Sequence, residues 1–135
     1  MSPETVAALE SCRAAEKEQA LFYRSLAAAA EAGGDEALAS RFHDLHADEQ
    51  HHLSRLTARL VELGVRPASV DAVTSPGAGL GAWAAEARRR ELREVDRYGE
   101  LLTANLDDAT RALVREIHAV EEHHAEELAG KWTLA

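Results

Sequence analysis

The sequence predicts an all-α protein: a four-helix bundle with one long crossover between its second and third helices. The composition is rich in alanine, leucine, glutamate and arginine, which favour helix, and it includes only three prolines. In four long stretches the apolar residues recur every three or four positions, the period of a helix with one buried face. A chain of 135 residues can bury its own core, so we expect a single domain over residues 1–135.

Charge and composition exclude several classes of function. A formal net charge of −9 argues against a surface for nucleic acid or anionic membranes. The one basic run, residues 88–90, is expected to be a solvated helix face. No stretch approaches the ~20 apolar residues of a membrane span, and charges interrupt the N-terminal region where a secretory signal needs an apolar run. The single cysteine, Cys12, cannot form an internal disulfide, and we expect its thiol to be buried. We expect the protein to be soluble and cytoplasmic.

The first helix is predicted from Ser2-Pro3 to about Ala32. Ser2 can cap the helix, and Pro3 suits the first helical position because its missing N–H is not needed there. Gly33 and Gly34 end the helix. The resulting loop is short, so the first two helices should be antiparallel neighbours.

The second helix is predicted over residues 36–63, with Asp35 as its cap. The stretch from Val65 to Gly79 follows and contains prolines and glycines. A helix of this length is roughly 40 Å long at about 1.5 Å per residue, and about fifteen extended residues span up to about 50 Å. The loop can therefore cross the length of the bundle, which would make the second and third helices parallel.

The third helix is predicted over residues 80–105. The fourth should begin at a cap formed by Asp107 or Asp108 and reach about Gly130.

Glutamates interrupt the apolar face of every predicted helix near its middle. The first and third helices have a single glutamate there, and the second and fourth have a Glu-x-x-His pair. A glutamate and a histidine three residues apart lie on one helix face and can bind a common metal, an arrangement found inside four-helix bundles. The six candidate ligands, which are also the candidate catalytic residues, are Glu16, Glu49, His52, Glu91, Glu121 and His124.

The second half of the sequence repeats the first, as if one helical hairpin were used twice. In each half a glutamate precedes a tyrosine by seven positions, and a His-x-x-Glu-x-x-His pattern follows. These positions are Glu16, Tyr23 and residues 46–52 in the first half, and Glu91, Tyr98 and residues 118–124 in the second. The sequence leaves the roles of His46 and His118 open.

Four glutamates and two histidines in one core layer would need compensation, because uncompensated buried charges cost several kcal/mol each. No Lys or Arg lies on the predicted faces. Two divalent cations would cancel four carboxylates while both imidazoles stay neutral. The alternative is a bundle whose acids lie on the surface, but the register of the pattern favours a dinuclear metal site.

The order Glu16, Glu49-x-x-His52, Glu91, Glu121-x-x-His124 resembles the di-metal carboxylate domain of the ferritin-like superfamily over nearly the whole chain. The spacing from glutamate to tyrosine resembles rubrerythrin-type members most. The resemblance implies two iron ions bridged by Glu49 and Glu121. It also implies an oxidoreductase, a peroxidase or ferroxidase acting in oxidative stress, that oxidises Fe(II) and reduces hydrogen peroxide or oxygen.

The same resemblance suggests roles for three further residues. Glu94 is similar to the additional exchangeable carboxylate of some rubrerythrins, with a partly exposed surface acid as the alternative. Tyr23 and Tyr98 would donate hydrogen bonds to the ligands, with core packing as the alternative. The cysteine-ligated rubredoxin module of rubrerythrins is absent, so an external electron donor is expected.

Two other functions stay open: an iron-binding module for storage or delivery, and a di-manganese catalase-like protein. Carboxylate and imidazole ligands suit both metals. We also expect a homodimer or a larger homo-oligomer.

Overall fold

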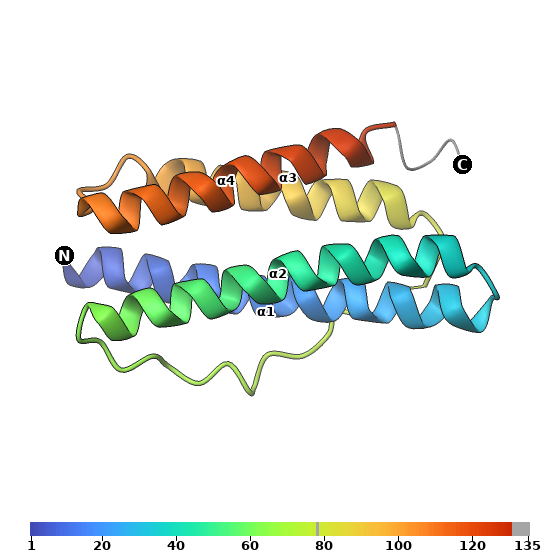
Figure 1. The fold of residues 1–135 in the computed structure, drawn as a ribbon, viewed down its shortest axis with the longest axis horizontal. Helices are drawn as coiled ribbons and strands as arrows, with labels where there is room; N and C mark the ends of the chain where they lie inside the picture. Colours follow the sequence, from blue (N-terminus) through green and yellow to red (C-terminus); the bar gives the residue numbers. More distant parts are fainter. Residues whose placement is uncertain (78, 131–135) are drawn as a thin grey trace. The chain divides into compact units, whose positions relative to one another are not determined.

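A computed structural model describes residues 1–77 and 79–130, and within them the chain forms four α-helices and no strand (Figure 1). The helices are α1 (Pro3–Ala32), α2 (Glu36–Glu62), α3 (Trp83–Leu101) and α4 (Asp108–Leu128). The predicted all-α class is therefore confirmed. None of the described helices is long and apolar enough to cross a membrane.

The chain divides into two compact units. The α1–α2 unit comprises Arg13–Trp83 and so contains most of α1, all of α2 and the loop that follows. The α3–α4 unit comprises Met1–Cys12 together with the chain from Ala84 onward. Each unit is described by itself below.

The α1–α2 unit is an antiparallel hairpin with a tight connection (Figure 1). Gly34 has a φ of 78°, a left-handed conformation that glycine adopts without strain. The carboxylate of Asp35 accepts the backbone N–H of Leu38 at 3.1 Å and caps α2 as predicted. Short connection and cap together fix the antiparallel pairing of the two helices.

The loop after α2 returns along the whole hairpin. Its middle contacts α1 through the hydroxyls of Ser75 and Ser25, which are 2.8 Å apart. At its end the ring of Trp83 packs edge-on against Phe42 near the start of α2, with 4.8 Å between the ring centroids. The predicted crossover is therefore present, and α3 begins at the end of the hairpin where α2 begins.

Arg13 fixes the first part of this loop. Its side chain is buried, and it donates from Nε to the Thr57 hydroxyl at 3.0 Å and from Nη1 to the Ala68 carbonyl at 2.9 Å. One guanidinium group thus joins α1, the last turns of α2 and the crossover. The apolar pattern of the sequence does not predict this buried arginine.

In the α3–α4 unit, α3 is shorter at both ends than the predicted range of 80–105. Ala82 has a φ of 53°, which is incompatible with a helix continuing through it. At the other end, Arg111 of α4 donates to the carbonyls of Leu102 and Ala104 at 2.7 and 2.9 Å. These bonds satisfy carbonyls that a longer helix would have used.

The fourth helix is close to its predicted range and begins after Asp107, whose carboxylate accepts the backbone N–H of Thr110 at 2.8 Å.

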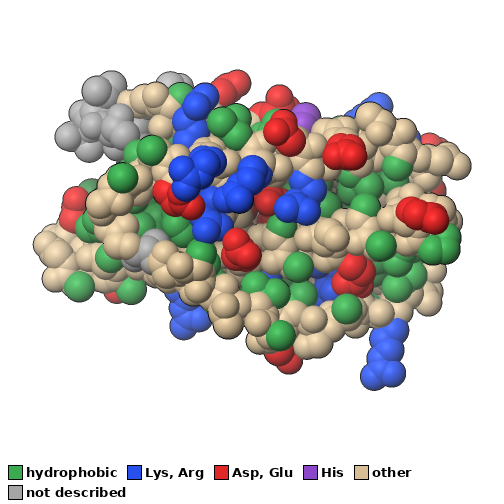
Figure 2. Space-filling model, turned by 180° about the vertical axis from the view of Figure 1, so that it is seen from behind, with side chains coloured by type: hydrophobic (Ala, Val, Ile, Leu, Met, Phe, Trp, Pro, Cys, Tyr) green, Lys and Arg blue, Asp and Glu red, His purple; other side chains and the backbone are tan. Residues whose placement is uncertain are grey.

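Two residues of the basic run on α3, Arg88 and Arg89, are exposed as predicted, whereas the Arg90 side chain is only 12% exposed. Arg89 and Arg90 both pair with Glu86 one turn earlier on the same helix. Figure 2 shows Lys and Arg side chains gathered beside acidic ones on one face of the molecule. Cys12, in contrast, is fully buried, as expected.

Candidate metal centre

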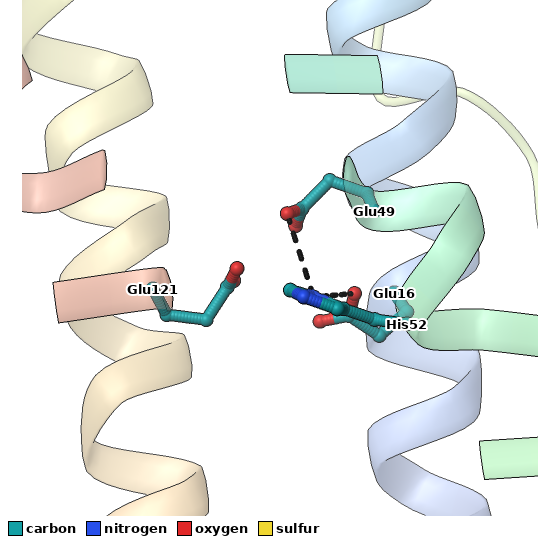
Figure 3. A group of neighbouring side chains, drawn as sticks. All are labelled: Glu16, Glu49, His52 and Glu121. Carbon is teal, nitrogen blue, oxygen red and sulfur yellow. Dashed lines mark hydrogen bonds and ion pairs between the residues drawn. The ribbon is translucent and has the colours of Figure 1, made fainter. Parts of the chain in front are cut away.

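The α1–α2 unit contains the first cluster of candidate ligands, Glu16, Glu49 and His52 (Figure 3). Glu49 and His52 lie on one face of α2 because they are three residues apart. His52 Nδ1 is 3.2 Å from an oxygen of Glu16 and 3.9 Å from an oxygen of Glu49. All three side chains are buried, and one ligand atom of each lies within 4.8 Å of the others.

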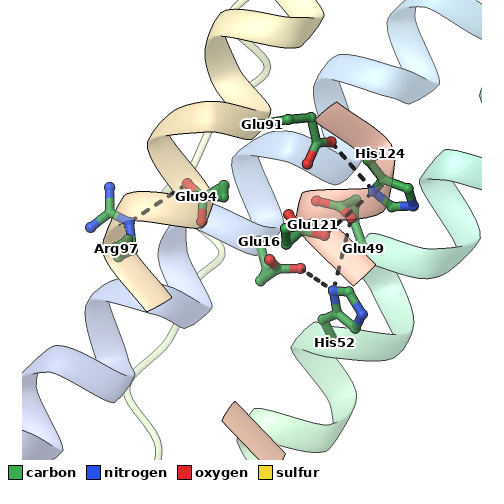
Figure 4. A network of polar contacts seen from close by, with 8 residues as sticks. All are labelled: Glu16, Glu49, His52, Glu91, Glu94, Arg97, Glu121 and His124. Carbon is green, nitrogen blue, oxygen red and sulfur yellow. Dashed lines mark hydrogen bonds and ion pairs between the residues drawn. The ribbon is translucent and has the colours of Figure 1, made fainter. Parts of the chain in front are cut away.

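The α3–α4 unit contains the second cluster, Glu91, Glu121 and His124 (Figure 4). His124 Nδ1 is 3.6 Å from an oxygen of Glu91 and 3.4 Å from an oxygen of Glu121. These side chains are buried too, and their ligand atoms meet the same limit of 4.8 Å. The structure therefore brings the six predicted residues together in two sets of three, one in each unit.

The donor chemistry of each cluster fits a divalent cation. Two buried carboxylates carry a charge of −2 when ionised, and a neutral imidazole adds a nitrogen donor without changing that charge. A cation of charge +2 cancels the carboxylates and replaces the solvation lost on burial. Oxygen and imidazole ligands suit iron and manganese alike.

Glu94 lies one turn after Glu91 and is also buried, so the alternative of a partly exposed surface acid is wrong. Burial raises the pKa of Glu94 to about 7; Arg97 opposes this rise and the carboxylate of Glu91 adds to it. The Nε atom of Arg97 is 3.6 Å from Glu94 Oε1 (Figure 4). Glu94 Oε2 has no hydrogen-bond partner within the described chain.

Tyr23 and Tyr98 are both fully buried. The ring of Tyr23 packs edge-on against Phe22, with 5.3 Å between centroids. Their burial agrees with core packing, and hydrogen bonding to the ligands stays a prediction.

His46 and His118 occupy matching positions in the sequence repeat but make different contacts. His46 Nδ1 is 2.9 Å from the carbonyl oxygen of Ala20. His118 Nδ1 is instead 3.2 Å from a carboxylate oxygen of Glu122, which is on its own helix. Neither of these contacts involves a candidate ligand. The three remaining histidines, His43, His51 and His123, are exposed.

Comparison with known proteins adds evidence on the fold. No protein-family model matches the chain, and no curated protein sequence matches it. Among solved structures the chain is similar to a ferritin from Chlorobium tepidum, with a TM-score of 0.86. The match covers 98% of this chain and 85% of that chain at 17% sequence identity. The chain has a ferritin fold.

This likeness confirms the predicted ferritin-like four-helix bundle with its crossover between α2 and α3. At 17% sequence identity the likeness establishes the fold alone. Membership of the ferritin-like superfamily and the assignment to the rubrerythrin type therefore stay predictions.

Proposed function

We propose that the chain is a di-iron oxidoreductase in which each cluster binds one metal ion. The main support for this proposal is that a buried set of two glutamates and one histidine occurs twice, once in each unit of a ferritin fold. The likeness to a protein named as a ferritin supports iron over manganese.

In this proposal Glu16, Glu49 and His52 hold one ion. The other ion is held by Glu91, Glu121 and His124, and the bridging roles predicted for Glu49 and Glu121 are part of the same proposal. A pair of bound Fe(II) ions would supply the two electrons that reduce peroxide or oxygen.

The chain's own residues would set the conditions for this chemistry. Burial of the ligands limits the access of water and strengthens their interaction with a cation. The carboxylate of Glu16, 3.2 Å from His52 Nδ1, fixes the orientation of that ring. Tyr23 and Tyr98 are proposed as hydrogen-bond donors near the ligands, and Glu94 as an additional, exchangeable carboxylate.

The proposal includes an external electron donor, because the single cysteine, Cys12, cannot form the internal disulfide that would exchange two electrons. It also includes assembly into a homodimer or larger oligomer in the cytoplasm. Light scattering across a range of protein concentrations tests the assembly, and a mass of one chain throughout would contradict it.

Anaerobic titration of the metal-free protein with Fe(II) tests the function directly. We expect saturation at about two Fe(II) ions per chain. Added peroxide should then be reduced at about one molecule per ion pair, since two Fe(II) and two protons convert one peroxide into two waters and leave two Fe(III). Turnover should then stop until a reductant is added. Glu62→Gln, an exposed change on the same helix as Glu49, serves as the matched control for Glu49→Gln.

The absence of saturable binding would reject the proposal. Uptake of many ions per chain by an assembly would favour iron storage, the second candidate function, which the likeness to a ferritin supports. Sustained oxygen release from peroxide without a donor would favour a di-manganese catalase.

A further inference from the structure

The α3–α4 unit has a cavity of about 420 Å³ between the first turns of α1 and the end of α3. Its rim is exposed and includes Glu4, Arg97 and Glu100. Its interior includes the buried side chains of Thr5 and Cys12. The cavity is therefore open to solvent, has two carboxylates at its rim, and contains hydroxyl and thiol groups further in.

Arg97 connects this cavity to the second cluster. The residue lines the cavity, and its guanidinium group pairs with Glu94 at 3.6 Å. The Glu94 side chain is only 7% exposed, and its second oxygen has no hydrogen-bond partner within the described chain. The carboxylate of Glu94 interacts electrostatically with that of Glu91, a candidate ligand. A continuous series of charged groups thus runs from the cavity to the cluster within one unit.

The sequence repeat provides an internal comparison for this series. Because Glu16 matches Glu91, the positions of Glu94 and Arg97 correspond to Gln19 and Phe22 in the first half. Gln19 and Phe22 are both buried and carry no charge. Packing of the bundle therefore does not require an ion pair at these positions, and the pair in the second half needs another explanation.

We propose that the cavity is a port through which divalent cations reach the second cluster, with Glu94 as the transfer ligand and Arg97 as its counterion at rest. The inference rests on the proposed function, because it assumes that the clusters bind metal. Glu4 and Glu100 attract the cation to the rim. The cation then replaces Arg97 as the partner of Glu94, and Arg97, whose side chain is 42% exposed, turns toward solvent.

This exchange is feasible because one positive partner replaces another at the same carboxylate. An ion pair with a partly exposed arginine is weak, so a divalent ion can compete for Glu94. The free oxygen of Glu94 offers a first contact before the pair with Arg97 has to break. Glu94 next passes the ion to Glu91, one turn away on the same helix.

Stopped-flow mixing of the metal-free full chain with Co²⁺ tests the port, using the visible absorption of bound Co²⁺ as the readout. We expect Arg97→Gln to raise the association rate about threefold or more, since it removes both a positive charge and the competitor for Glu94. Glu94→Gln should lower the rate about tenfold, and Glu100→Gln should lower it about threefold at low salt. The matched control is Arg88→Gln, an exposed change on the same helix outside the cavity.

The number of Co²⁺ ions bound at equilibrium separates the two proposals. Wild-type binding at two ions per chain, with rates in the three variants equal to that of Arg88→Gln, would overturn the port and leave the proposed function intact. No Co²⁺ binding to the wild type would overturn both. Arg97 and Glu100 are exposed, so their substitution spares the core. A slower association rate in Glu94→Gln supports the port if this variant still binds the wild-type number of Co²⁺ ions at equilibrium. A slower rate together with fewer bound ions counts against it, because Glu94 would then be needed for binding itself.

Discussion

The two clusters have the same ligand types at the same spacing, but their surroundings differ. Next to the first cluster the helix continues with Gln19 and Phe22, both buried and uncharged. Next to the second cluster the matching residues are Glu94 and Arg97, an ion pair that borders a cavity. The comparison shows that a repeated ligand set does not imply repeated surroundings: buried uncharged residues occupy these positions in one half, and an ion pair that includes a cavity-lining arginine occupies them in the other.

The two histidines that lie one turn before the ligand glutamates also have different surroundings. His46 contacts the backbone of α1, whereas His118 pairs with a half-exposed glutamate of its own helix. An added Cβ at Gly99 would lie 3.4 Å from His118 Nε2, so this ring packs closely over the backbone of α3. Each unit therefore positions its extra histidine by contacts of its own.

The largest effect is expected from replacing a ligand carboxylate by an apolar residue. Glu49→Leu and Glu121→Leu should each abolish binding of at least one of the two ions. In the absence of metal, each variant should be more stable than the metal-free wild type, by roughly 1–4 kcal/mol, because a buried charge is removed. Metal analysis and calorimetry with and without chelator check both effects. Equal melting temperatures for the wild type with saturating iron and with chelator would contradict a metal site in the core.

The second prediction concerns Glu94, the additional carboxylate beside the second cluster. Burial raises the pKa of Glu94 from an ordinary 4.5 to about 7, so the folded chain keeps a proton that the unfolded chain releases between these values. The stability of the metal-free protein should therefore fall as pH rises through this window, and the full cost should be present above pH 7. Glu94→Gln should be more stable than the wild type by roughly 3 kcal/mol at pH 8, and the difference should vanish near pH 4.

Urea unfolding across this pH range checks the prediction, with the exposed change Glu126→Gln as the control. A constant difference between Glu94→Gln and the wild type at every pH would show that Glu94 does not titrate in this window.

Most of the fold was predictable because its signals are local. The apolar period located all four helices, and Asp35 and Asp107 act as the expected caps. The candidate ligands were predictable for the same reason, since each interrupts the apolar face of its own helix. The length of α3 was not, because its end depends on Arg111 of the next helix.

The differences between the two halves were not predictable from the sequence. Arg97 gave no signal, since an arginine among other arginines on a helix is ordinarily a surface residue. The cavity it lines needs side chains from the start of α1 and the end of α3, which are about ninety residues apart in the sequence. Contacts between residues so far apart produce no periodic pattern in the sequence, so the cavity could not be predicted from it.

The smallest effect is expected from the residue that joins the crossover to α1 and α2 in the first half. Arg13 donates to the hydroxyl of Thr57 and to the carbonyl of Ala68, which is 55 residues away in the sequence. Arg13→Met keeps most of the apolar stem and removes both hydrogen bonds, so we expect a loss of about 1–2 kcal/mol in the free energy of unfolding. Hydrogen exchange should become faster in the loop over residues 65–77, while α4 should stay protected. The exposed loop change Arg66→Met is the control. Unchanged exchange in the loop of Arg13→Met would show that the contacts of Ser75 and Trp83 hold the crossover in place without Arg13.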